Sequence, residues 1–239
     1  FTTTNHQSLL CFTNKGRVYN LRVYQVPEAP LRAKGKHLAN LVNLADGERV
    51  ISVLPIGEFK GSSYVFSVTR KGYIKKTDLM AYANVRSSGI IGLKLDEGDD
   101  LIACVMGSDG NDVLVATRLG KSIRFKESEV RTMGRASRGV TAIRFTGEED
   151  GVIGLAVIKT GDEAGSLLSI CENGYGKRTA IEEYRQQTRQ KCARATPRSR
   201  ASPPSEPPPV RPRSAPGPQV PCEVARVTCR HVSLRDQTP

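Results

Sequence analysis

The feature that most constrains the fold of this chain is a repeat of about 50 residues. Glycines fall at positions 16, 72, 120 and 174, spaced 56, 48 and 54 apart, within the related segments FTNKGRVYNL, VTRKGYIKKT, ATRLGKSIRF and CENGYGKRT. A second family of segments recurs in step with the first and has turn glycines at positions 47, 98 and 147. Short strands repeated at such a period are typical of a propeller-like array rather than of a sandwich.

The third copy, Val113 to Val157, shows most completely what one repeat encodes. The apolar strand VLVAT leads into the tight turn RLGK, where Gly120 is free to take a positive φ. SIRF alternates apolar and polar residues, and the segments VTAIRF and VIGLAVI follow on either side of the acidic turn GEEDG. We therefore interpret each repeat as a four-strand blade.

The sequence thus predicts an all-β, propeller-like pinwheel of three blades and a partial fourth. The expected boundaries are residues 1–58, 59–107 and 108–160, with the partial blade at residues 161–189. Glycine-turned hairpins form the first half of each blade, and a crossing loop precedes its second half.

The composition of the chain changes near residue 190. Residues 190–239 hold eleven of the 14 prolines and no Phe, Tyr or Trp. Such a segment cannot bury enough apolar surface to offset its ordering entropy, so we expect a Pro/Arg-rich disordered tail. Its residues Arg, Pro, Ser and Ala have GC-rich codons, and we hypothesise out-of-frame translation. An open frame that encodes the same tail in independent isolates would remove this hypothesis.

The net charge of +12 is shared by the tail and the repeats, with +6 in each. A basic surface on a β-protein points to nucleic acid or another polyanion, although a merely solvated surface gives the same charge.

No run of 18 apolar residues predicts a transmembrane helix, and no signal peptide is recognisable. Cys11, Cys104 and Cys171 lie in apolar strand patterns and are expected to be buried free thiols, as in a reducing cytoplasm.

Basic residues recur at equivalent places and form the candidate DNA-binding set, because sequence-independent binding requires several cations that neutralise phosphates. The hairpins contribute Lys15, Arg17, Arg70, Lys71, Lys75, Lys76, Arg118, Lys121, Arg124 and Lys126. A second row on the loops contains Lys34, Lys36, Arg86, Arg131, Arg135 and Arg138, and the fourth copy adds Lys177, Arg178, Arg185 and Arg189. Recurrence predicts that the hairpin cations share one rim of the array.

The acidic turns recur as well, and we interpret them as a separate solvated face that DNA avoids rather than as metal-binding or acid–base groups. They contain Asp46, Glu48, Asp96, Glu97, Asp99, Asp100, Glu148, Glu149 and Asp150. Cys222, Cys229 and His231 lack the spacing of a zinc site. No Walker loop, HExxH or GxSxG segment is present, so no catalytic residue and no metal ligand is predicted.

The segments FTNKGRVYNLRVYQVPEA, RSSGIIGLKLDEGDDLI, Val115–Phe125 and ENGYGKRTAIEEYR carry a family resemblance. Over residues 1 to about 189 the chain resembles the carboxy-terminal DNA-wrapping domain of DNA gyrase A subunits. The resemblance implies a β-pinwheel, six-bladed when complete, with double-stranded DNA wrapped round its basic rim in support of negative supercoiling.

The same resemblance implies a non-catalytic part of an ATP-hydrolysing type II topoisomerase. The DNA-cleaving tyrosine would lie in another domain, and Tyr184 would be a strand-end or loop residue near DNA. ATP and Mg²⁺ would be used elsewhere in the holoenzyme, so no cofactor is expected in this chain. The implied partners are the rest of gyrase A and gyrase B in an A2B2 assembly, without a membrane, in the bacterial cytoplasm at the nucleoid.

Three departures from the family pattern keep alternatives open. The chain begins after the place of a Gln/Arg/Gly/Lys box that precedes the first blade, and the last two blades are missing. After Tyr184 the segment YRQQTR continues as QKCARATPRSR in place of a Gly-Gly-Lys-Gly sequence. The alternatives are the corresponding domain of topoisomerase IV, and a propeller that binds proteins but not DNA.

Overall fold

The computed structural model describes residues 1–30, 32–86, 88–145, 147, 149–161, 165–171, 174–189, 194–195 and 224–229. Nearly all regular structure is β-strand, which confirms the predicted all-β class. The strands of the first two repeats are β1 (Ser8–Thr13), β2 (Arg17–Arg22), β3 (Val50–Ile56), β4 (Ser63–Thr69), β5 (Tyr73–Asp78), β6 (Ile90–Ile91) and β7 (Leu101–Ser108).

The later strands are β8 (Asp112–Thr117), β9 (Lys121–Lys126), β10 (Val140–Thr141), β11 (Val152–Ile158), β12 (Ser166–Cys171), β13 (Gly176–Ala180), β14 (Arg194–Ala195) and β15 (Val224–Cys229). Single 3-10 turns join them at η1 (Val23–Gln25), η2 (Leu38–Asn40), η3 (Leu79–Tyr82), η4 (Glu127–Glu129) and η5 (Ile181–Glu183). None of the helices in the described part of the chain has the length and apolar character needed to cross a membrane.

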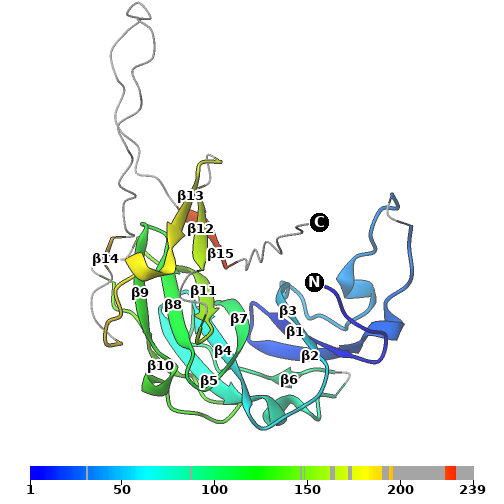
Figure 1. The fold of residues 1–239 in the computed structure, drawn as a ribbon. Helices are drawn as coiled ribbons and strands as arrows, with labels where there is room; N and C mark the ends of the chain where they lie inside the picture. Colours follow the sequence, from blue (N-terminus) through cyan, green and yellow to red (C-terminus); the bar gives the residue numbers. More distant parts are fainter. Residues whose placement is uncertain are drawn as a thin grey trace, which may run out of the picture.

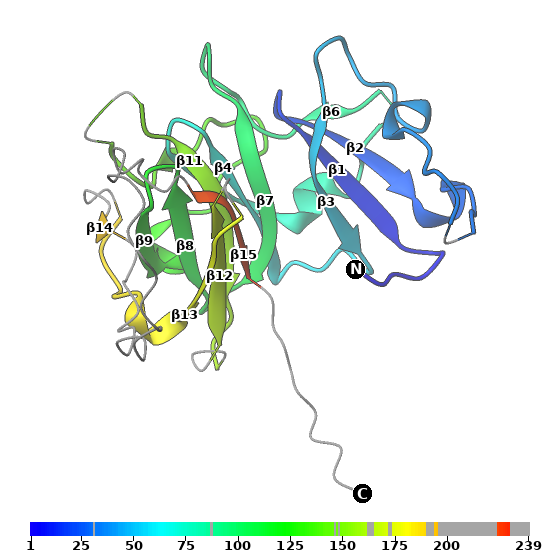
Figure 2. The same ribbon diagram turned by 90° about the horizontal axis from the view of Figure 1, so that it is seen from above.

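The strands form four antiparallel sheets arranged as an arc (Figure 1). Their strand orders are β3-β1-β2-β6, β7-β4-β5-β10, β11-β8-β9-β14 and β15-β12-β13. Contacts join β3 to β7, β7 to β11 and β11 to β15, so these strands form the inner side of the arc. The outer strands β6, β10 and β14 follow its convex side (Figure 1), and β7 lies between the first sheet and the later sheets (Figure 2). This arrangement confirms the predicted pinwheel.

Each outer strand comes from the next repeat along the chain. Ile90 and Ile91 of β6 pair with β2, and Val140 and Thr141 of β10 pair with β5. The prediction that the third copy forms a four-strand unit by itself is therefore wrong: β10 completes the second sheet, and β14 completes the third. A two-residue strand carries too weak a local pattern to reveal which sheet it joins.

The hairpin glycines stabilise this pairing between neighbouring repeats. The carbonyl oxygen of Gly16 accepts hydrogen bonds from the backbone N–H groups of Gly92 (2.8 Å) and Leu93 (3.0 Å). The carbonyl oxygen of Gly72 accepts from Ala142 (2.8 Å) and Ile143 (3.4 Å) in the same way. The recurring glycine thus allows the hairpin turn and also receives the chain of the following repeat.

Apolar cores fill the spaces between successive sheets. Phe12 of the first sheet packs edge-to-face on Tyr82 of the second repeat, with ring centroids 5.6 Å apart. Phe66 and Phe125 belong to the core shared by the second and third sheets. Since the second and third sheets bury both faces against neighbouring sheets, the repeats stabilise one another.

The free face of the first sheet is covered by its own repeat rather than by another sheet. Leu9, Cys11 and Tyr19 on this face pack with Val42, and Leu38 of η2 also contacts this cluster. The loop between β2 and β3 therefore closes the first end of the array.

The tail prediction concerns residues that lie mostly outside the described ones. Residues 194–195 and 224–229 are described, and both segments are strands. For the rest of residues 190–239, disorder and out-of-frame origin stay predictions. Cys11 and Cys104 are buried free thiols as predicted, whereas Cys171 is disulfide-bonded, contrary to the prediction.

Candidate nucleic-acid interface

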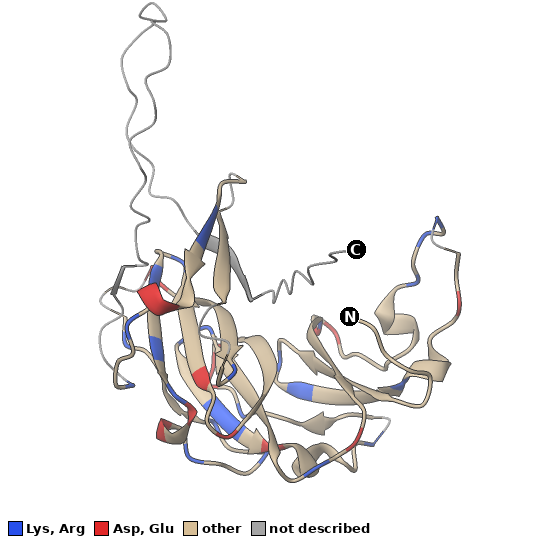
Figure 3. Ribbon diagram, viewed as in Figure 1, with Lys and Arg blue, Asp and Glu red and all other residues tan. Residues whose placement is uncertain are grey.

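The basic hairpin turns lie at the same end of each sheet as the acidic turns. Backbone hydrogen bonds join Asn14 N–H to the Arg49 carbonyl, and Arg70 N–H to the Asp100 carbonyl. Arg118 N–H donates to the carbonyl of Gly151, immediately after the third acidic turn. The predicted separation of basic and acidic faces is therefore wrong at this end, and Figure 3 shows the two charges close together along the ribbon.

Several hairpin cations are engaged by these neighbours. Arg70 Nη2 lies 2.6 Å from Asp100 Oδ2, and Lys71 Nζ donates to the carbonyl oxygen of Glu97 at 2.7 Å. Arg17 donates to the carbonyl of Ser88 at 2.7 Å. A phosphate group at these turns would have to compete with existing partners.

The acidic turns have a structural role that the sequence did not reveal. Glu48 accepts hydrogen bonds from Thr13 Oγ1 (2.6 Å), Tyr19 Oη (2.8 Å) and the N–H of Ala45 (2.9 Å). Burial opposes the charged form, but these hydrogen bonds and Arg17 outweigh it and lower the pKa of Glu48. Asp150 accepts from Thr117 Oγ1 at 3.0 Å at the equivalent turn. One carboxylate in each of these turns thus secures the adjoining hairpin.

Three predicted DNA-binding residues are not on the surface. Lys75 is 0% and Lys76 5% exposed, and the side chain of Arg124 is 11% exposed. Lys76 Nζ lies 2.5 Å from Glu127 Oε2 and 3.8 Å from the ring centre of Tyr64. The prediction that these cations line an exposed rim is wrong, because both faces of the middle sheets are covered.

Lys75 joins two crossing segments inside the molecule. Its ammonium group donates to the carbonyl oxygen of Gly92 and, at 2.5 Å, to that of Arg135. Burial lowers the pKa of Lys75 to about 8.

This low pKa predicts a pH-dependent stability. Unfolding exposes Lys75 and restores its ordinary pKa near 10.5, so the unfolded chain binds more protons between about pH 8 and 10.5. The folded state therefore becomes more stable relative to the unfolded state as pH rises, because Lys75 loses its proton more readily in the folded state. We expect the unfolding free energy of the parent to rise by about 1 kcal/mol relative to Lys75→Met between roughly pH 7 and 9, measured by urea denaturation. A constant difference would contradict the prediction.

The remaining predicted cations differ in whether their side chains have partners among the described residues. Arg138 pairs with Asp96 at 2.9 Å, Arg178 donates to Ser166 at 2.6 Å, and Arg189 donates to the Thr141 carbonyl at 2.8 Å. Arg118 is exposed, and Lys121, Arg135 and Lys177 are half-buried. Among the predicted cations, the exposed ones whose side chains have no hydrogen bond or ion pair with another described residue are Lys15, Lys34, Lys36, Arg86, Lys126, Arg131 and Arg185.

Three of these uncommitted cations lie on crossing segments. A crossing segment is the chain that leads from a 3-10 turn to the outer edge of the preceding sheet (residues 83–95, 130–145 and 184–189). Arg86, Arg131 and Arg185 occupy successive crossing segments on the convex side of the arc. Lys34 and Lys36 lie on the corresponding loop of the first repeat. These loop and crossing-segment cations, rather than the hairpin row, therefore form the candidate surface.

Exposed Lys94, Arg144 and Lys159 were missed by the sequence reasoning. Each is a single polar residue that follows an apolar run, in GLK, AIR and VIK. Such an interruption marks the point where a strand or crossing segment reaches solvent. By contrast, Tyr184, which was predicted to be a strand-end or loop residue near DNA, directly follows η5 and is 3% exposed in the core between the third and fourth sheets.

Comparison with known proteins assigns the chain to a family. A family model described as the DNA gyrase C-terminal domain, beta-propeller, matches residues 7–56, 63–106, 111–159 and 166–191. The chain belongs to this family. The matched ranges follow the predicted repeats.

Curated relatives agree with the family at the level of sequence. The DNA gyrase A protein of Deinococcus deserti is 43% identical over 186 residues, which cover 77% of this chain and 23% of the relative. That of Escherichia coli is 43% identical over 75% of this chain and 20% of its own length. The chain therefore spans about a fifth of the gyrase A proteins that it matches.

Solved structures agree at the level of fold. The C-terminal domain of DNA topoisomerase IV has a TM-score of 0.76 and 24% identity, over 95% of this chain and 64% of that one. A DNA gyrase A C-terminal domain has a TM-score of 0.65 and 23% identity, over 78% and 59%. The strong sequence relatives are gyrase A proteins, which favours gyrase over the topoisomerase IV alternative.

Within the described residues, no group of three or more His, Cys, Asp or Glu side chains is placed to hold a metal ion.

Proposed function

We propose that this chain binds and bends duplex DNA along the convex side of the arc, as the DNA-wrapping part of gyrase A. The observation that carries the proposal is the row of uncommitted cations on successive crossing segments. Contacts to phosphates without base-specific groups would make the binding independent of sequence and strongly dependent on salt. Bending DNA round the arc would be offset by these distributed contacts.

In this proposal the chain works with the remainder of gyrase A and with gyrase B, in the cytoplasm at the nucleoid. Wrapping would present a DNA segment of defined handedness to the strand-passing parts of that enzyme, and the chain itself would do no chemistry. Family membership and the identity to gyrase A proteins support this assignment.

The test compares two double variants of the full chain that each change the charge by the same amount. Arg86→Glu with Arg131→Glu alters the crossing segments, whereas Lys15→Glu with Arg49→Glu alters exposed cations at the hairpin-turn end. Binding to a duplex of roughly 40 base pairs is measured by fluorescence anisotropy across a salt series.

We expect the crossing-segment variant to bind more weakly and to lose about two units of the log–log salt slope. The hairpin-turn variant should keep most of the parental slope. Equal effects of the two variants would contradict the assignment of the surface. No DNA binding by folded parent protein would favour the protein-interaction alternative.

Wrapping is tested separately from binding. Relaxed circular DNA is closed by a nicking-closing enzyme in the presence of the chain, and the linking number is then measured. A shift that grows with protein concentration supports wrapping, and an unchanged linking number despite tight binding would favour a topoisomerase IV-like role.

A further inference from the structure

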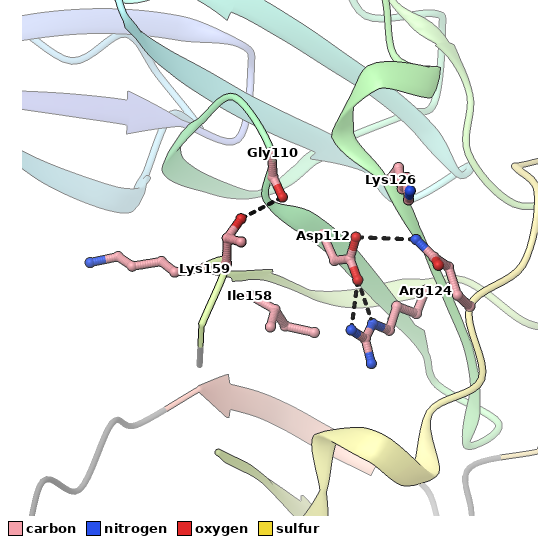
Figure 4. Close-up of a pocket in the computed structure, with 8 residues that line it drawn as sticks. Gly110, Asp112, Arg124, Lys126, Ile158 and Lys159 are labelled. Carbon is pink, nitrogen blue, oxygen red and sulfur yellow. Dashed lines mark hydrogen bonds and ion pairs between the residues drawn. The ribbon is translucent and has the colours of Figure 1, made fainter. Parts of the chain in front are cut away.

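A cavity of about 300 Å³ lies at the end of the third sheet opposite its hairpin turn. The start of β8, the ends of β9 and β11, and Gln186 of the last crossing segment form its walls. Its charged lining residues are Asp112, Arg124, Lys126 and Lys159 (Figure 4).

The floor of the cavity is fixed by internal hydrogen bonds. Arg124 holds Asp112 Oδ2 through Nε at 2.8 Å and Nη2 at 2.7 Å, and Gln186 Nε2 donates to Asp112 Oδ1 at 3.3 Å. Arg124 Nη1 also donates to the carbonyl oxygen of Ile181 at 3.1 Å. The single carboxylate is therefore neutralised within the floor.

Two lysines that line the cavity have no partner for their ammonium groups among the described residues. Lys126 and Lys159 are exposed, and neither side chain has a hydrogen bond or ion pair with another described residue. Figure 4 shows the two residues on either side of Asp112, with the side chain of Lys159 extended away from it. Their flexible side chains can approach one anion from two directions, as a phosphate with several acceptor oxygens requires.

The equivalent position of the second sheet has the opposite charge. The register pair Asp112–Lys126 corresponds there to Tyr64–Asp78, and Lys159 corresponds to Ser108, since Ile158 pairs with Asp112 as Gly107 pairs with Tyr64. Lys76, the counterpart of Arg124, is held there by Glu127 and Asp109. The second sheet therefore lacks the positive charge that the third sheet carries at this position.

We propose that this cavity binds a phosphate group, supplied by the DNA backbone as the duplex passes from the crossing segment at residues 130–145 to the one at residues 184–189. This inference rests on the proposed function and deepens it. Gln186 follows exposed Arg185 directly, so the cavity is continuous with the crossing-segment surface. Lys126 and Lys159 bind the phosphate oxygens, and Arg124 positions the floor.

The test is the Lys126→Ala, Lys159→Ala double variant of the full chain, with Lys15→Ala, Arg49→Ala as a control that removes the same charge. We expect a loss of DNA affinity of about tenfold at physiological salt and a salt slope smaller by about two units, whereas the control changes both less. Both lysines are exposed, so circular dichroism should show an unchanged fold.

A second arm uses inorganic phosphate as the probe and records amide NMR shifts of Gly110, Thr160 and Gln186. Saturable shifts in the parent that vanish in the Lys126→Ala, Lys159→Ala variant support a phosphate site. Should those shifts occur while DNA binding is unaffected, the phosphate source would be a soluble ligand, and the DNA assignment of the cavity is overturned.

The experiments distinguish a failure of the cavity proposal from a failure of the proposed function. If Arg86→Glu with Arg131→Glu weakens DNA binding but the cavity variant neither weakens it nor loses phosphate shifts, the cavity proposal is overturned and the function stands. If the parent does not bind DNA, the proposed function fails independently.

Discussion

Replacing Lys76 with methionine is expected to lower the free energy of unfolding by about 3–5 kcal/mol. Lys76 of the second sheet and Glu127 of the third repeat are both buried, and their Nζ and Oε2 atoms lie 2.5 Å apart. Removal of the ammonium group would leave the carboxylate of Glu127 buried without its counter-charge. Urea denaturation at neutral pH measures the loss.

Two further variants distinguish the effect of the ion pair on stability from the effect of side-chain size. Lys76→Met with Glu127→Met removes both charges and should recover much of the loss, because a buried pair contributes little net stability compared with apolar replacements. Lys126→Met makes the same substitution at an exposed position and should change stability by less than about 0.5 kcal/mol. A Lys76→Met variant as stable as the Lys126→Met variant would show that the pair does not join the sheets.

Gly72→Ala is expected to destabilise the fold by about 3 kcal/mol, from left-handed backbone strain together with overpacking. Gly72 has a φ of +86°, and a Cβ atom there would lie 2.7 Å from the carbonyl oxygen of Ile143. This contact is the place where the third repeat attaches to the second, so the clash acts on the interface between repeats.

Gly47→Ala provides the matched control for this prediction. Gly47 has a φ of +72°, but a Cβ atom would meet nothing within 4 Å. It should therefore cost only about 1–2 kcal/mol of backbone strain. Amide exchange adds a local readout, since the N–H of Ala142 donates to Gly72 and should lose protection in Gly72→Ala. Equal costs at the two glycines would contradict the role of Gly72 in joining the repeats.

The candidate surface was only partly predictable from the sequence. Recurrence at equivalent positions identified both rows of cations, because a repeat places equivalent residues in equivalent surroundings. It could not separate Lys76, which has a buried partner from the third repeat, from Arg131, which has none among the described residues. The partner Glu127 lies 51 residues away, and no local pattern joins the two.

Recurrence also misled the interpretation of the second hairpin. In YIKKTD it placed Lys75 and Lys76 on the exposed rim, although neighbouring residues of a strand point to opposite faces of the sheet. The structure buries Ile74, Lys75, Lys76 and Thr77 alike, because the second sheet lies between two others. Both faces of this strand are therefore interfaces between repeats and not a surface.

The sequence by itself determined the repeat, the all-β class and the glycine hairpins, since turn conformation and strand patterning are local properties encoded within a few residues. Only the tertiary structure decided which sheet β6 and β10 complete, which cations are buried, and that the acidic turns secure the hairpins. Those outcomes depend on contacts between residues far apart in the chain, where burial and pairing, rather than residue type, determine whether a charge meets solvent or a partner.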